Sequence, residues 1–269
     1  MFLYFKRREK RGKREAPRPR FLVLRRKTLT VGAALLAAAA IFGAVNAPAA
    51  VRASVATRQL PIYCVERDQK VCSISFDAAW GNEDTQTLID ILDKYDIHAT
   101  FFVVGDWVDK YPESVKALSD AGNEVMNHSS HHAHFSQLND SEIVSDITAC
   151  NEKIAAVTGE TPVLFRCPYG EYDDHVISAV NGMGMTAVQW DVDSLDWKGI
   201  SADEIKSRVL KNVSPGSIVL FHNAAENTPQ ALPGIIESLI ADGYRIVPIS
   251  QMLLSGDYTI DHTGRQCAK

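Results

Sequence analysis

The chain has 269 residues and a formal net charge of −5, but this charge is divided very unevenly along the sequence. The first 27 residues contain twelve Lys or Arg and only two acids, which leaves 16 basic and 31 acidic residues in the rest. A body this acidic argues against a nucleic-acid partner, because binding to phosphates requires basic surface.

The first 51 residues predict an export segment. Residues 1–27 are basic, and residues 28–51 carry no charge and include the apolar run "VGAALLAAAAIFGAV". A basic segment before such a run is typical of a secretory signal or an uncleaved signal-anchor. We expect residues 1–27 to be cytoplasmic and residues 28–51 to be a single-pass anchor in the cell membrane, with the catalytic body extracellular. Small residues near Ala47 leave a cleaved signal peptide and a secreted body as the alternative.

Residues 52–67 are predicted to form a linker and a short β segment, which brings the chain to its first cysteines. Cys64 and Cys72 flank "VERDQK", a plausible turn between two short strands, and could form a disulfide in an exported protein. The five cysteines show no CxxC spacing, so a cysteine-metal site is not indicated.

From residue 68 onward, apolar β-rich runs alternate with amphipathic helical stretches. Continuous apolar strands that alternate with helices are typical of a parallel sheet covered by helices. We therefore expect an α/β fold, a distorted (β/α)7-type barrel over residues 68–255, followed by a C-terminal tail at 256–269. The seven predicted strands are 71–76, 99–104, 124–127, 163–167, 186–190, 217–221 and 245–249. The predicted helices are 83–95, 112–122, 140–159, 173–184, 201–213 and 229–243.

Ionisable side chains follow five of these seven strands. In a barrel of this kind the active site lies at the carboxyl ends of the strands, so these groups are expected on one rim. A single acid at a strand end is more often a helix cap, and a single histidine there is more often a core residue. The joint pattern favours catalysis, and its members are Asp77, His128, Arg166, the acids Asp191, Asp193 and Asp196, and His222.

The motifs around these residues resemble those of a known family. Their order is "SFDAAWG", "HSSHH", "RCPYG", "DSLDW" and "LFH". This order resembles the five motifs of the polysaccharide deacetylases, the NodB-homology domain of carbohydrate esterase family 4. The form "FDAAWG" further resembles sporulation-associated, membrane-anchored deacetylases of spore-forming Gram-positive bacteria.

The resemblance implies hydrolysis of N-acetyl groups on a β-1,4-linked aminosugar polymer, such as peptidoglycan or a chitin-like chain in the cell or spore wall. It assigns Asp77 as the general base that takes a proton from water, with Arg166 holding Asp77 ionised. It assigns His222 as the acid that protonates the leaving amine, and we expect Asp193 to keep His222 protonated.

The resemblance also implies a divalent metal, zinc or cobalt, held by His128 and His132. A backbone N–H near Tyr169 would meet the oxyanion of the tetrahedral intermediate. The remaining substrate-binding residues are predicted to be Trp80, Trp197 and Leu220, the last two around the acetyl methyl group.

The first motif departs from the family at Ala78, where the family usually has an acid that binds the metal. Catalytic zinc normally has three protein ligands, and only two histidines remain here. Another residue could substitute, and the candidates are Asp84, Asp191 and His131. Alternatively the ion is bound weakly, or the chain is an inactive glycan-binding wall protein. An O-acetyl esterase of the xylan type is a further alternative.

Overall fold

A computed structural model describes residues 35–37 and 58–269 of the chain. The compact unit runs from Arg58 to Lys269 and therefore includes the two segments, 58–67 and 256–269, that the sequence places outside the catalytic domain. The predicted basic segment, most of the predicted anchor and residues 52–57 lie outside the described residues. Within the described residues, no helix has the length and apolar character to cross a membrane.

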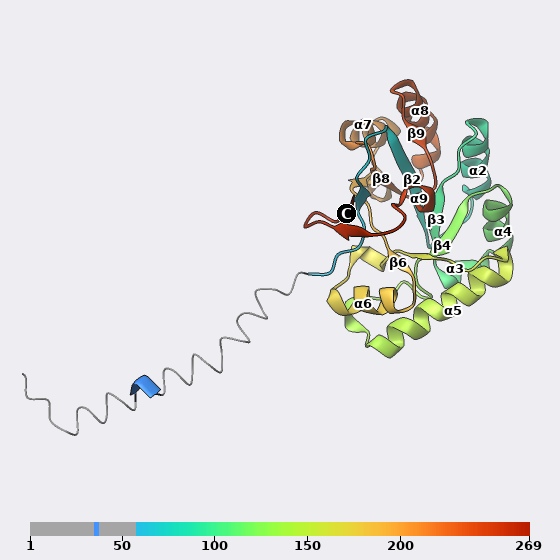
Figure 1. Ribbon diagram of the computed structural model, residues 1–269. Helices are drawn as coiled ribbons and strands as arrows, with labels where there is room; N and C mark the ends of the chain where they lie inside the picture. The colour runs from blue at the N-terminus through green and yellow to red at the C-terminus, as the bar shows by residue number, and fades with distance from the viewer. Residues whose placement is uncertain (1–34, 38–57) are drawn as a thin grey trace, which may run out of the picture. The chain divides into compact units, whose positions relative to one another are not determined.

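A curved parallel sheet forms the centre of the unit (Figure 1). Its strands follow the order β6-β5-β4-β3-β2-β8-β7, and β9 pairs in parallel with the start of β2. The sheet curls into a half-barrel, and the predicted (β/α)7-type fold is confirmed. The strands are β2 (Val71–Ala78), β3 (Thr100–Val103), β4 (Glu124–Asn127), β5 (Leu164–Phe165), β6 (Thr186–Ala187), β7 (Val192–Asp193), β8 (Ile218–His222) and β9 (Arg245–Ile246).

Helices cover the outer face of this sheet (Figure 1). Their termini follow from local sequence: in α5, Asn139 and Glu142 form a reciprocal capping box, and Gly159 ends the helix in the left-handed conformation. Ser201 and Glu204 cap α7 in the same way. The helices are α2 (Thr85–Lys94), α3 (Gly105–Lys110), α4 (Pro112–Asp120), α5 (Asp140–Thr158), α6 (Asp174–Gly182), α7 (Ala202–Asn212), α8 (Thr228–Ala241) and α9 (Ile249–Met252).

The segment before β2 lies between the two ends of the curved sheet. Ile62 forms a parallel bridge with Val188, just beyond β6, and Cys64 forms an antiparallel bridge with Ser217, just before β8. The same segment contains β1 (Cys64–Val65), which pairs with β11 (Arg265–Ala268), and β11 pairs with β10 (Tyr258–Ile260). The predicted C-terminal tail is thus a hairpin that extends the sheet of β1.

The predicted disulfide between Cys64 and Cys72 is wrong, because both cysteines are buried free thiols. The chain around Ser217 lies between them: Cys64 bridges to Ser217, and Ser73, next to Cys72, donates its N–H to the Ser217 carbonyl. Two strand spacings amount to roughly 9–10 Å, which exceeds the Cα separation that a disulfide spans.

Strand register brings the predicted catalytic groups to one end of the sheet. Asp77 of β2 lies opposite Phe102 of β3 on one side and opposite His222 of β8 on the other. His128 directly follows β4, and Arg166 directly follows β5. The carboxyl ends of β5 and β4 on one side of β3, and of β2 and β8 on the other, therefore supply the site.

Candidate active site

Asp77 is held by a buried arginine. Arg166 has no exposed surface, and its Nη1 donates to Asp77 Oδ1 at 2.8 Å. Its Nη2 donates to Ser75 Oγ and to the Gln189 carbonyl oxygen, both at 3.0 Å. Its guanidinium lies 4.1 Å from the centre of the Phe102 ring. These contacts fix the guanidinium in one position beside the carboxylate.

Asp77 is kept ionised by its surroundings, with Arg166 as the permanent positive charge. Burial alone would raise the pKa of Asp77, but His128, Arg166 and His222 together hold it below its usual value. Burial also lowers the pKa of His128. His128 is therefore neutral at neutral pH, and Arg166 supplies the permanent charge. An ionised Asp77 can accept a proton, as a general base requires.

The tautomer of His128 follows from its backbone contact. His128 Nδ1 lies 2.8 Å from the Arg166 carbonyl oxygen, which can only accept, so Nδ1 carries the proton. The other nitrogen, Nε2, then presents a lone pair 3.5 Å from Asp77 Oδ2. A cation or a water hydrogen between these two atoms would satisfy both lone pairs.

His132 completes the predicted pair of imidazole ligands. Its ring centre lies 5.0 Å from that of His128, and burial, followed by the effect of His128, lowers its pKa to about 4. Its backbone is left-handed, with φ of 54°, and its N–H donates to Ser129 Oγ at 2.9 Å. Two neutral imidazoles are thus positioned side by side, as metal ligands require.

None of the three candidates for the missing ligand is available at this pair. His131 Nδ1 lies 2.9 Å from Asp106 Oδ1 on the surface. Asp191 accepts from Ser217 Oγ and the Ile218 N–H at the opposite end of β8.

Asp84 Oδ2 accepts from the Ala224 N–H, and its buried Oδ1 has no partner among the described residues, but Asp84 forms no metal-binding group with the two histidines. Ala78 is buried and has no donor atom. In the part of the chain that the structure describes, no three His, Cys, Asp or Glu side chains form a metal-binding group. The residues present do not fit a zinc site with three protein ligands.

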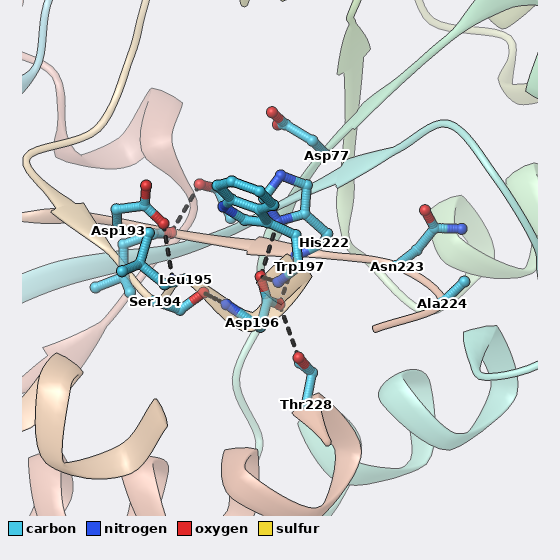
Figure 2. A network of polar contacts seen from close by, with 12 residues as sticks. Asp77, Asp193, Ser194, Leu195, Asp196, Trp197, His222, Asn223, Ala224 and Thr228 are labelled. Atoms are coloured by element: carbon cyan, nitrogen blue, oxygen red, sulfur yellow. Dashed lines mark hydrogen bonds and ion pairs between the residues drawn. The ribbon is translucent and has the colours of Figure 1, made fainter. Parts of the chain in front are cut away.

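His222 is hydrogen-bonded to Asp196, whereas Asp193, which was predicted to keep His222 protonated, contributes to its raised pKa only through its charge. His222 Nδ1 lies 2.8 Å from Asp196 Oδ1, and its backbone N–H donates to Asp196 Oδ2 at 2.9 Å. Thr228 Oγ1 also donates to Asp196 Oδ2, whereas Asp193 accepts from the Leu195 N–H (Figure 2). Burial would lower the pKa of His222, but the hydrogen bond to Asp196 and the negative charges of Asp77, Asp196 and Asp193 together raise it.

Nine of the ten predicted site residues line one cavity. The tenth, Arg166, is fully buried behind Asp77. The cavity has a volume of about 460 Å³. We call it the catalytic cavity, and it is lined by Asp77, Trp80, His128, His132, Tyr169, Trp190, Asp193, Trp197, Leu220 and His222.

Tyr169 lies at the rim of the cavity in a left-handed turn, with φ of 58°. Its side chain is 61% exposed, and its backbone N–H has no hydrogen-bond acceptor among the residues that the structure describes. A free N–H at this rim is a suitable donor to a developing oxyanion.

The sequence did not identify the functional contacts of Ser75, Asn223 or Asp196. Asn223 donates its N–H to the Asp77 carbonyl and accepts from the Ala79 N–H, so it ties β8 to the loop after β2. In the sequence, the position of Asn223 directly after His222 was the feature that could have indicated this role. Asp196 stands among the acids after the fifth predicted strand, but spacing alone does not identify which acid contacts His222.

Comparison with known proteins agrees with this geometry. The family profile described as polysaccharide deacetylase matches residues 65–188. The peptidoglycan-N-acetylmuramic acid deacetylase PdaC of Bacillus subtilis is 36% identical over 188 residues, which cover 70% of this chain and 40% of the relative. A peptidoglycan-N-acetylglucosamine deacetylase of Bacillus cereus is 32% identical over 194 residues, covering 70% of this chain and 91% of that relative.

Solved structures share the fold. A CE4 family pseudoenzyme from Bacillus anthracis gives a TM-score of 0.69 at 34% identity, covering 71% of this chain and 68% of that chain. A mutant of that pseudoenzyme, described as having restored enzymatic activity, gives 0.69 at 35% identity, covering 71% and 70%. With its motifs in order on the carboxyl ends of a half-barrel and its sequence matched over the same region, the chain belongs to the polysaccharide deacetylase family.

Proposed function

We propose that this chain hydrolyses N-acetyl groups of a β-1,4-linked aminosugar polymer, peptidoglycan or a chitin-like chain, in the cell or spore wall. The observation that carries the proposal is that one cavity holds a carboxylate with a lowered pKa and an imidazole with a raised pKa. Asp77 is kept ionised beside Arg166, and His222 is kept protonated by Asp196. Among the relatives are a peptidoglycan deacetylase and a chitooligosaccharide deacetylase.

The proposed reaction uses one base and one acid. Asp77 takes a proton from a water molecule, whose oxygen attacks the carbonyl carbon of the acetamide. The Tyr169 N–H donates to the resulting oxyanion. The C–N bond then breaks as His222 gives its proton to the departing amine, and acetate and a free aminosugar result. Trp197 and Leu220 line the same cavity as these groups, and we assign to them the contact with the acetyl methyl group.

The site offers a divalent ion, zinc or cobalt, fewer than three protein ligands. His128 and His132 offer two imidazole nitrogens, and Ala78 contributes no ligand. Loss of an outer partner already lowers metal affinity by roughly 10–100-fold, so loss of a direct ligand lowers it at least as much. We propose that any ion is bound weakly and completes its coordination with water.

The absence of a ligand at Ala78 favours a second candidate function, a glycan-binding wall protein without turnover. The similar structure from Bacillus anthracis is described as a pseudoenzyme, and in this chain a direct ligand is absent at Ala78. The intact Asp77–Arg166 and His222–Asp196 pairs favour the active enzyme, since a binding protein has no need for either.

The proposed location is the outer side of the cell membrane. It rests on the basic residues 1–27 and the uncharged stretch 28–51. A cleaved signal peptide would instead release the same catalytic unit outside the cell.

Acetate release tests the proposal directly. The purified full chain would be incubated with N-acetylglucosamine oligomers and with peptidoglycan, first stripped of metal and then with zinc or cobalt restored. Release that is lost in Asp77→Asn supports the deacetylase. Glycan binding without acetate release under any metal would support the binding protein, and wild-type rates in Asp77→Asn would remove Asp77 from the role of base.

A further inference from the structure

A short strap before β2 joins the β6 side of the curved sheet to its β8 side. We define the strap as residues 58–65. Ile62 donates its N–H to the carbonyl oxygen of Ala187, the last residue of β6, at 2.9 Å, and Val65 donates to the Gly216 carbonyl oxygen, shortly before β8, at 2.9 Å. The match to the family profile begins at residue 65, so the strap lies almost wholly before the matched region.

Hydrogen bonds connect the strap to the catalytic base. Gln189 donates its N–H to the Ile62 carbonyl oxygen at 2.7 Å. The carbonyl oxygen of the same Gln189 accepts from Arg166 Nη2 at 3.0 Å, and Arg166 Nη1 donates to Asp77 Oδ1 at 2.8 Å. Three consecutive hydrogen bonds therefore lead from Ile62 to Asp77.

The position of Arg166 depends on the Gln189 carbonyl. Among the described residues, its guanidinium has three acceptors, which are Asp77 Oδ1, Ser75 Oγ and the Gln189 carbonyl oxygen, and its Nε has none. A fully buried guanidinium cannot replace a lost acceptor with bulk water, so a shift of Gln189 leaves a charged donor unsatisfied. The strap, which fixes Gln189, thus helps to fix Arg166.

The side chain of Ile62 acts on the same arginine through packing. Ile62 has no exposed surface and belongs to the apolar cluster that contains Val188 and Phe102. The Arg166 guanidinium lies over the Phe102 ring, 4.1 Å from its centre. Because protein interiors are close-packed, loss of side-chain volume at Ile62 leaves a space into which its neighbours shift.

We propose that Ile62 is a positioning residue for the Asp77–Arg166 pair, and that it acts through the backbone of Gln189 and the ring of Phe102. It touches neither substrate nor the reacting atoms. Its effect on the rate rests on the proposed function, whereas its effect on the position of Arg166 does not.

Hydrogen exchange of Arg166 tests the positioning without turnover. Exchange of the guanidinium protons of Arg166 and of the Gln189 amide proton would be measured by NMR in the full chain. The Arg166 signals are identified by their loss in Arg166→Lys. In Ile62→Ala we expect both sets of protons to exchange roughly tenfold faster or more, relative to the amides of β8, because the strap opens locally.

Ile62→Val is the conservative variant. It removes a single methyl group, so it should fold, accelerate exchange in the same direction by less, and retain most of the rate of acetate release. Thermal unfolding would establish that Ile62→Ala is folded.

Ile154→Ala is the matched control, since Ile154 of α5 is equally buried but belongs to the apolar cluster that lacks Phe102. It should lose stability without faster exchange at Arg166 relative to β8. Unchanged relative exchange at Arg166 in folded Ile62→Ala and Ile62→Val, or equal effects of Ile62→Ala and Ile154→Ala, would overturn the proposal.

Acetate release gives the catalytic consequence. Ile62→Ala should lower kcat by roughly tenfold with little change in KM, because misplacement of the base affects the chemical step rather than glycan binding, and Ile154→Ala should leave kcat unchanged. Absence of acetate release by the unaltered chain would reject the deacetylase, and the exchange experiment would still decide the role of Ile62.

Discussion

Asp196 raises the pKa of His222 more than Asp193 does, and this difference can be measured in a pH profile. Asp196→Asn keeps the size of the side chain but removes its charge, so the pKa of His222 should fall. Because His222 acts as an acid only when it is protonated, the alkaline limb of the profile of kcat should move to lower pH by the same amount.

Asp193→Asn is the control for this prediction. Asp193 lines the catalytic cavity but bonds to the Leu195 N–H, so its replacement should move the alkaline limb only slightly. A shift in Asp193→Asn as large as that in Asp196→Asn would contradict the assignment. Thermal unfolding of both variants would establish that each is folded, since Asp196 is buried.

His134 packs on Tyr169, so its contribution to catalysis can be tested. The two rings are stacked, with centres 4.4 Å apart and planes at 12°, and His134 Nδ1 lies 2.5 Å from Glu171 Oε2. Removal of this support should let the left-handed Tyr169 turn relax. We expect His134→Ala to lower kcat by roughly tenfold with little change in KM.

His131→Ala is the matched control for His134→Ala. His131 forms a similar surface pair with Asp106 but, unlike His134, does not stack on Tyr169, so its loss should leave kcat unchanged. His134→Phe retains the stacking and should recover most of the rate. Equal effects of His131→Ala and His134→Ala would show that the support of Tyr169 is irrelevant to catalysis.

At the scale of elements, a substitution at the end of β2 tests the proposed weak metal binding. Ala78→Asp places a carboxylate at the position where the family usually has one. We expect affinity for zinc to rise by roughly tenfold or more and the metal-dependent rate to rise with it. Metal content and acetate release would be measured on the same preparations.

Ala78→Asn controls for volume at this site, since it adds a similar side chain without a charge. Ala78 is 1% exposed, so both variants also lose some stability, and thermal unfolding would measure this loss. Unchanged zinc affinity in a folded Ala78→Asp variant would show that the carboxylate does not reach the histidine pair. Retained affinity in His132→Ala would show that the pair is not the site.

The elements differ in how far the sequence predicts them. All seven predicted strands are present, because each contains buried apolar residues and lies between stretches with a helical pattern. The sequence predicts the short β segment that contains β1, but it misses β7, which has two residues, and the hairpin of β10 and β11, whose residues mix polar and apolar types. Short strands of this kind depend on tertiary pairing, which no local pattern records.

The same limit applies within the site. The strand ends predict which elements deliver Asp77, His128, Arg166 and His222. They do not predict that Asp196, three residues after Asp193, is the acid that turns toward His222, because the turn at Leu195 decides this. Nor do they reveal the strand that separates Cys64 from Cys72.

At the scale of the whole molecule, buried thiols should make the fold sensitive to alkali. Burial raises the pKa of Cys72, Cys150 and Cys167 to about 12 each. In the unfolded chain these thiols ionise near pH 9, so the folded state keeps protons that the unfolded state has lost. Their contribution to stability is complete below about pH 9 and is lost progressively as the pH rises toward 12.

Each thiol removes roughly 1.4 kcal/mol of unfolding free energy per pH unit within this window, so the three together remove about 4 kcal/mol for each pH unit. This is a large part of the roughly 5–15 kcal/mol that stabilises a typical domain. Urea unfolding in the presence of a reductant should therefore show a midpoint that falls steeply between pH 9 and 10.5. A variant with Ala at all three positions should lose stability less steeply over the same interval, and an identical slope would show that other groups cause the alkaline loss.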